Sequence, residues 1–429
     1  MTRTAARNDV PGFVSSPGLA FVAYHALDEK PAFKLAPYEH EGRWYLFVGH
    51  SWHRGWTVLD VTDPESPTIV QFIDGPANTW TLQVQAANGV LMTALEAIGG
   101  PDEERAAALW GKEPGVPNEE GVLFWDIHDP SQPTYVGRFE TGGAGTHRNF
   151  FVGTDRAYLA ANMEGYVGNI FVTLDVSDPS RPREIARWHF PGQWVAGGET
   201  PDDVHYLHGP PYVIGDRAYV PFGRAGFVIL DLSDERNPKL VGRLDIGGFG
   251  SIIGVHSVLP LLERDLAIVT TEVIYEGGMD PMNLVITVDI SDETNPRPIA
   301  HFPTPIPPAE VTVSDFNELG GRFGPHNLHL PHELPWLAPV TNRVHLTYEN
   351  AGLWTFDISN PRLPRVADYF IPDPPTTRRG LLPRQLATQS EDVAVDARGY
   401  VYVSDKNHGL FILRDTFIET SDTESTAIL

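Results

Sequence analysis

The sequence of 429 residues contains no cysteine. This absence excludes disulfides, iron–sulfur clusters, thiolate zinc sites and a cysteine nucleophile. Basic residues are scarce as well, with 31 Lys and Arg against 56 Asp and Glu and a formal net charge of −25. Because phosphate binding requires clustered Lys and Arg, we expect no nucleic-acid partner and no binding to anionic membranes. An acidic protein instead favours the capture of cations.

Long apolar runs and familiar catalytic motifs are also missing. No stretch approaches the roughly 18 apolar residues of a membrane span, so we expect no membrane segment. The N-terminal "MTRTAARNDVPGF" lacks the apolar region of a secretory signal, which predicts a cytoplasmic protein. There is no HExxH, no G-x-S-x-G, no phosphate-binding glycine loop and no EF-hand. The 40 Gly and 38 Pro favour many turns over long helices.

One short motif recurs six times along the chain. It reads D-hydrophobic-S/T/H-D/N-x-x-x-P, as in "LDVTDPESP" and "LDVSDPSRP". The first aspartates of the six copies are Asp60, Asp126, Asp175, Asp231, Asp289 and Asp357. An apolar strand ends at each of them, a second Asp or Asn accepts backbone N–H groups, and Pro fixes φ as the chain reverses. The motif therefore predicts a hairpin between two strands.

The spacing of the motif predicts the architecture. Two further strands precede each copy, so each unit holds four antiparallel strands, and the copies lie 49 to 68 residues apart. Such repetition predicts an all-β, seven-bladed β-propeller. The last unit lacks a fourth strand, and "LAFVAYHAL" (19–27) is predicted to fill that place and close the ring. We expect an N-terminal tail at 1–18, one propeller at 19–417 and a C-terminal tail at 418–429.

The segments "LDVTDP", "LDVSDPSRP" and "FDISNP" resemble those of the LVIVD-repeat family of propellers. The resemblance covers roughly residues 40 to 415. It implies the propeller fold and nothing about activity, because the motif lies in a structural turn. No catalytic residue can be carried over from the family.

Four histidines occupy matching places in successive units. His147, His208 and His256 each stand ten residues before a matching position in the next strand, and His326 follows Gly-Pro as His256 follows Gly-Val. A single histidine at a channel mouth most often only hydrogen-bonds to water or a carbonyl. The set of four instead predicts one divalent transition metal on the propeller axis, with iron as first choice and copper, manganese or zinc as alternatives.

Other polar residues are predicted near the same face. Ligating imidazoles need acceptors that fix the tautomer, and we expect these from Glu96, Glu272, Glu349 and Asp405. Candidate catalytic residues are His53 and His408 for substrate contact or proton transfer, Glu391 as a base and Arg148 to hold a carboxylate or polarise a carbonyl. Long loops are predicted to form an apolar lid through Trp110, Trp194, Tyr275, Met279, Met282, Phe316 and Phe323.

The sequence thus predicts a metal-dependent enzyme acting on a small, partly apolar substrate. Four histidines gathered on a seven-bladed propeller form an arrangement that resembles that of the carotenoid-cleavage oxygenases, although none of the sequence motifs of those enzymes is present. An oxygenase or oxidase is the first interpretation. A metal-dependent hydrolase or lyase on the same histidines is the first alternative. The second is a non-catalytic scaffold that binds a protein partner and holds no metal.

Overall fold

The computed structural model describes residues 2–4, 10–99, 103–201, 206–246, 253–280 and 283–418. Its elements are almost all strands, and the α-helix of the described residues is α1 (Glu103–Trp110). Among these residues, no helix is long and apolar enough to cross a membrane. The predicted all-β class is therefore confirmed.

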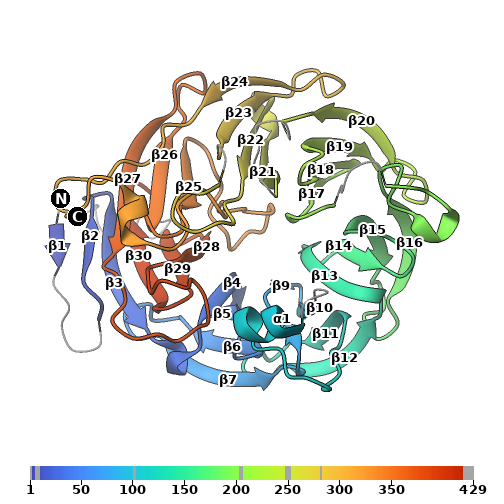
Figure 1. The fold of residues 1–429 in the computed structure, drawn as a ribbon, viewed down its shortest axis with the longest axis horizontal. Coiled ribbons are helices and arrows are strands. Elements are labelled where there is room, and N and C mark those ends of the chain that lie inside the picture. The colour runs from blue at the N-terminus through green and yellow to red at the C-terminus, as the bar shows by residue number, and fades with distance from the viewer. Residues whose placement is uncertain are drawn as a thin grey trace, which may run out of the picture.

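Antiparallel sheets stand in a ring around a central axis (Figure 1). Each sheet runs from a strand near the axis to a strand at the rim, and consecutive strands along the chain are neighbours. The first three sets of strands are β4 (Ala32–His40), β5 (Arg43–His50), β6 (Gly55–Asp60) and β7 (Thr68–Asp74); β8 (Thr79–Trp80), β9 (Val84–Ala87), β10 (Val90–Ala97), β11 (Gly121–Asp126) and β12 (Thr134–Phe139); and β13 (Gly142–Phe151), β14 (Arg156–Met163), β15 (Ile170–Asp175) and β16 (Arg183–Trp188).

The second half of the ring follows the same order (Figure 1). Its strands are β17 (Tyr212–Ile214), β18 (Arg217–Pro221), β19 (Phe227–Asp231) and β20 (Lys239–Leu244); β21 (Val255–Leu261), β22 (Leu266–Thr271), β23 (Val285–Asp289) and β24 (Arg297–His301); β25 (Arg343–Thr347), β26 (Leu353–Asp357) and β27 (Arg365–Pro372); and β28 (Ser390–Val395), β29 (Tyr400–Asp405) and β30 (Gly409–Asp415). Before β25 in the chain, Leu328 pairs with Leu346 of that strand through an isolated antiparallel β-bridge.

The N-terminal segment joins the C-terminal half of the ring. Strand β3 (Leu19–His25) pairs with β30 and is the fourth strand of that sheet. Before it, β2 (Phe13–Ser15) pairs with β27, and β1 (Thr2–Thr4) pairs with β2. Strands β1 to β3 and β30 consequently lie on the same side of the ring (Figure 1).

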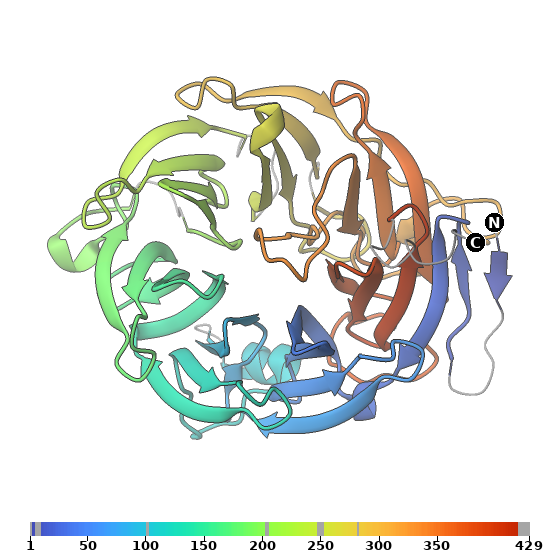
Figure 2. The ribbon, with the colours of Figure 1, turned by 180° about the vertical axis from the view of Figure 1, so that it is seen from behind.

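The recurring motif forms the turn that its residues predict. Asp175 ends β15 and accepts hydrogen bonds from the backbone N–H of Ser177 at 3.0 Å and from its hydroxyl at 2.7 Å. Asp178 accepts the N–H of Ser180 at 3.0 Å. The same pattern holds at Asp289 and the other copies. These turns lie at the rim, away from the axis (Figure 2).

The axial strands carry the features that build the site. Register shifts occur near the start of four of them, where one or two residues have no partner on the neighbouring strand. The residues skipped in this way are Phe33 and Lys34 in β4, Gly143, Ala144 and His147 in β13, His256 in β21, and Glu391 and Asp392 in β28. Such β-bulges re-aim side chains and are frequent next to active sites.

Candidate functional site

The four histidines predicted from the repeat lie together at the axis. His147 and His256 are bulge residues of β13 and β21, while His208 and His326 lie in the segments before β17 and β25. The ring centroids of His147 and His208 are 4.3 Å apart, those of His208 and His256 5.4 Å, and those of His256 and His326 4.7 Å. The prediction that these side chains meet in space is therefore supported by their geometry.

Hydrogen bonds fix the tautomers of three of these rings. Nδ1 of His147 lies 2.6 Å from Oε2 of Glu96, Nδ1 of His326 lies 2.7 Å from the carbonyl oxygen of Glu391, and Nδ1 of His256 lies 3.2 Å from the carbonyl oxygen of His326. Because a carbonyl or a carboxylate only accepts, Nδ1 carries the proton in each ring. Burial lowers the pKa of His256 and His326 well below its ordinary value, because a buried site disfavours the charged ring.

The position of Arg148 shows which ring nitrogens of His256 and His326 carry lone pairs. Its Nη2 atom lies 3.1 Å from Nε2 of His256 and 3.4 Å from Nε2 of His326. A guanidinium only donates hydrogen bonds, so both Nε2 atoms accept them and carry lone pairs. The Arg148 side chain is buried, and its guanidinium carbon stands 5.3 Å from the ring centroid of Phe33. Arg148 thus occupies the space on which two of the lone pairs converge.

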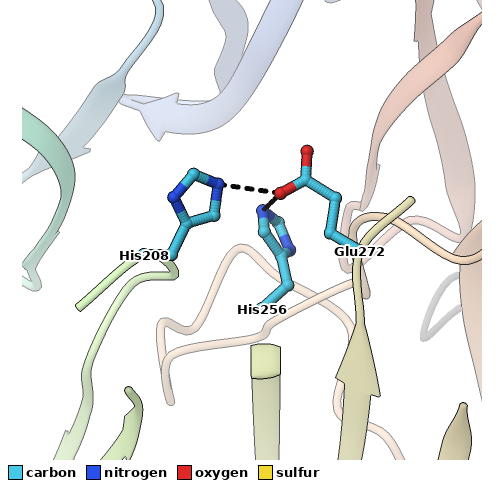
Figure 3. A group of neighbouring side chains, drawn as sticks. All are labelled: His208, His256 and Glu272. Carbon is cyan, nitrogen blue, oxygen red and sulfur yellow. Dashed lines mark ion pairs between the residues drawn. The ribbon is translucent and has the colours of Figure 1, made fainter. Parts of the chain in front are cut away.

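Glu272 is the carboxylate of the histidine cluster (Figure 3). It follows β22, and its Oε2 lies 2.8 Å from Nε2 of His208 and 3.6 Å from Nε2 of His256. Its Oε1 lies 3.6 Å from Nε2 of His326. Burial alone would raise the pKa of Glu272, but the charges that His256 and His208 can carry hold that pKa well below its usual range. The carboxylate faces the ring nitrogens, so it stands as an acceptor for His208, the kind of role predicted from the sequence, and also among the candidate ligands.

A second acidic group lies beside the first. Glu391, Glu349 and His326 offer ligand atoms within 4.8 Å of one another. The ammonium group of Lys406 contacts Oε1 of Glu391, and Nη1 of Arg322 lies 3.9 Å from Oε1 of Glu349. Burial raises the pKa of both carboxyl groups, and the proximity of Glu391 raises that of Glu349 further. Glu391 lines the central cavity, whereas Glu349 lies behind it.

Three predicted site residues lie elsewhere. His53 is exposed in the turn between β5 and β6 and does not line the cavity. Nε2 of His408 lies 2.9 Å from the carbonyl oxygen of Asp373, in a separate surface pocket. Asp405 accepts the backbone N–H groups of Gln389 and His408 and so shapes a turn. His53 and His408 lie in strand-connecting loops and Asp405 ends β29, and none of the three lines the central cavity.

A cavity of about 320 Å³ opens above the histidines. Its walls combine aromatic and charged side chains, namely Phe33, Trp52, Trp80, Trp110, Tyr206, Glu96, Glu272, Glu391, Arg148, Arg322 and Lys406. This volume lies at the lower end of the range for small-molecule sites. The sequence predicted apolar covering of the site, but it missed Trp52 and Arg322, which carry no repeat signature.

The predicted lid residues divide into three groups. Trp110, at the end of α1, lines the cavity. Trp194, Tyr275 and Met279 are exposed to solvent, and Met282 lies outside the described residues. Phe316 and Phe323 pack with the hydrophobic core around β21 and β25 instead. The lid is therefore smaller than predicted, and α1 is its main element.

The fold and the central cavity define a β-propeller. The sequence model of the LVIVD repeat matches residues 165–189, 212–246 and 388–413, so the chain carries LVIVD repeats, as the resemblance predicted. No curated protein matches the chain. Among solved structures, the periplasmic gluconolactonase PpgL of Pseudomonas aeruginosa is 13% identical with a TM-score of 0.51, covering 86% of this chain and 93% of its own. This likeness shows the fold alone.

Two further structures align over most of the chain with lower scores. The computationally designed Ika8 protein is 8% identical with a TM-score of 0.48, covering 92% of this chain and 98% of its own. Sqt1 of Saccharomyces cerevisiae is also 8% identical with a TM-score of 0.48, covering 89% of this chain and 84% of its own.

Proposed function

We propose that the protein is a metal-dependent enzyme with one divalent transition metal at the axis. His208, His256 and Glu272 offer ligand atoms within 4.8 Å of one another and form the core of the proposed site. His326 and His147 flank this core and supply the further imidazoles of the predicted four-histidine set. The single observation that carries the proposal is the orientation of three rings, those of His147, His256 and His326, which hold Nδ1–H on acceptors and leave Nε2 facing the cluster.

The composition of the cluster favours redox chemistry. Two histidines and one carboxylate with open positions are typical of non-haem iron oxygenases, and we propose an oxygenase or oxidase with iron as the first choice and copper or manganese behind it. The metal would supply the activation of oxygen. Aromatic walls next to polar groups suit a small, partly apolar substrate.

Arg148 has a defined part in this proposal. Its guanidinium and a metal ion would use the same Nε2 atoms of His256 and His326. Metal binding would therefore move the guanidinium off these nitrogens and leave a cation on the cavity wall. There it can hold an anionic group of the substrate, which is the role predicted from the sequence.

A hydrolase or lyase is the second candidate. Glu391 lines the cavity, and its Oε2 lies 3.4 Å from Nδ1 of His326, so a carboxyl group that can serve as a base or acid borders the space proposed for the substrate. Zinc as the bound metal would favour this reaction class. A gluconolactonase shares the fold, and lactone hydrolysis is one reaction to include in a test.

The two reaction classes can be separated by reconstitution. The protein is stripped with a chelator, reloaded with Fe(II), Cu(II), Mn(II) or Zn(II), and assayed for oxygen consumption and for lactone and ester hydrolysis. Oxygen consumption with iron or copper, lost in Glu272→Gln, supports the oxidase. Hydrolysis with zinc, lost in Glu391→Gln, supports the second candidate. A folded protein that takes up none of these metals would instead favour a protein-binding scaffold.

A further inference from the structure

Three tryptophans line one cavity and are called the tryptophan wall. Trp52 lies in the turn between β5 and β6, Trp80 ends β8, and Trp110 ends α1. The rings of Trp80 and Trp110 meet edge to face, with centroids 4.9 Å apart. The indole N–H of Trp52 donates to the carbonyl oxygen of Leu109 at 3.2 Å, which ties the third ring to the helix. Indole faces are large flat surfaces that favour planar ring ligands.

Close packing holds this wall in place from behind. A Cβ atom at Gly380 would lie only 2.4 Å from the Trp52 ring, so the loop backbone presses directly against the indole. Nη2 of Arg54 donates to the carbonyl oxygen of Gly111 at 2.6 Å and fixes the residue after α1. The tryptophan wall is consequently preorganised, and a ligand that stacks on it does not have to order it first.

A cation stands among the groups facing this wall. Each carboxylate that lines the cavity already has a partner: Glu96 has His147, Glu272 has His208, and Glu391 has Lys406. In contrast, the ion pairs of the described residues include none to Arg148, whose Nε atom also has no hydrogen-bond partner there. Nearby carboxylates, that of Glu272 foremost, act on Arg148 only from beyond ion-pair distance, and an anionic ligand group would pair with the guanidinium directly.

We propose that the cavity binds a planar aromatic carboxylate, with its ring against Trp80 and Trp110 and its carboxylate on Arg148. That this compound is the substrate rests on the proposed function, whereas its binding does not require a metal. Two features of the cavity define this class of ligand, because the tryptophan wall selects a flat ring and Arg148 selects a negative charge.

The test is calorimetric titration of the protein, both as purified and after removal of metal by a chelator. The probes are cinnamate, 3-cyclohexylpropanoate with the same charge but a puckered ring, and cinnamyl alcohol with the same ring but no charge. We expect cinnamate to bind about three- to tenfold tighter than the cyclohexyl acid. We also expect it to bind about ten- to hundredfold tighter than the alcohol. Equal affinities for cinnamate and the cyclohexyl acid, or no binding of cinnamate, would overturn the proposal.

Variants locate the binding. Trp110→Leu and Trp80→Leu should each weaken cinnamate binding, while Trp194→Leu, at an exposed tryptophan outside the cavity, should leave it unchanged. Arg148→Met should abolish the preference for cinnamate over cinnamyl alcohol. Equal effects of the Trp110 and Trp194 variants would contradict the assignment to this wall. Cinnamate binding in a protein that takes up no metal would support this pocket and refute the proposed metal centre, so the two failures are distinguishable.

Discussion

Nε2 of His208 lies 2.8 Å from Oε2 of Glu272, although the two residues belong to neighbouring sheets of the ring. His208 precedes the axial strand of one sheet, and Glu272 follows the second strand of the next. The site is therefore assembled between sheets rather than within one, and its geometry depends on the whole ring being formed.

Loss of a proposed ligand should lower the metal content. We expect His208→Ala, His256→Ala and Glu272→Gln each to reduce metal affinity by at least about tenfold, because each removes a donor from a buried cluster. The control is His53→Ala, which removes an exposed imidazole outside the cavity. Metal titration of the stripped proteins measures the effect, and equal affinities in all four variants would refute the ligand assignment.

Removal of the competing cation should have the opposite effect. Arg148→Met keeps the side chain long and apolar but frees Nε2 of His256 and His326. We therefore expect metal affinity to rise, by roughly tenfold, since one positive charge no longer competes in a buried site. Titration with Co(II) as a spectroscopic probe measures the change. Weaker Co(II) binding in this variant would show that Arg148 supports the metal site instead of competing with it.

The partner of His147 offers a subtler test. Glu96 holds Nδ1–H of this ring, so Glu96→Ala should leave the imidazole free to rotate and lower metal affinity by roughly ten- to a hundredfold. Glu65→Ala, at an exposed residue of a rim turn, is the matched control. If both variants bind metal as the unmodified protein does, then His147 is no ligand and the site consists of the remaining residues.

A buried ion cluster away from the site predicts how stability depends on pH. Oδ2 of Asp415 lies 2.9 Å from Nε of Arg343 and 2.9 Å from Nε2 of His345. Burial would raise the pKa of Asp415, but the hydrogen bond and charge of His345, with that of Arg343, lower it to about 2. Because the folded-state pKa is depressed, the stabilisation is complete above the ordinary carboxyl pKa near 4 and disappears as the pH falls towards 2.

This cluster can be tested by denaturation at two pH values. At pH 7, Asp415→Asn should lower the free energy of unfolding by roughly 2 kcal/mol, the order expected for such a shift. At pH 2.5 the difference between the two proteins should be much smaller. An equal difference at both pH values would show that ionised Asp415 does not contribute through its charge.

The repeat allows the turns and the positions of three histidines to be predicted from the sequence. Asp175 and the equivalent aspartates of the other motif copies predict the turns, because an aspartate that ends a strand can accept hydrogen bonds from the backbone N–H groups that follow it. The repeat also aligned His147, His208 and His256 at one level of the axis. Strand alternation would place His147 and Arg148 on opposite faces, yet both line the cavity. The β-bulge at His147 turns both side chains towards the cavity, and no pattern in a single sequence predicts such a bulge.

Glu272 shows the other limit. Its carboxylate is predicted as an outer partner together with that of Glu96, but Glu96 lies within β10, whereas Glu272 lies after the end of β22, where the chain leaves the sheet. The direction of a side chain beyond the end of a strand depends on the conformation of the loop, and no periodicity of the sequence predicts it. Trp52 of the tryptophan wall is not predicted because it stands at no repeat position, whereas Trp110 is predicted as a lid residue.

The metal content of the purified protein tests the central proposal most directly. Untagged protein, prepared without chelators, is measured by plasma mass spectrometry together with the Glu272→Gln variant. The proposed site predicts about one iron, copper, manganese or zinc per chain, and a marked loss in the variant. A folded, metal-free protein that also refuses added metal would contradict the metal centre and leave the histidines as lining of the propeller axis.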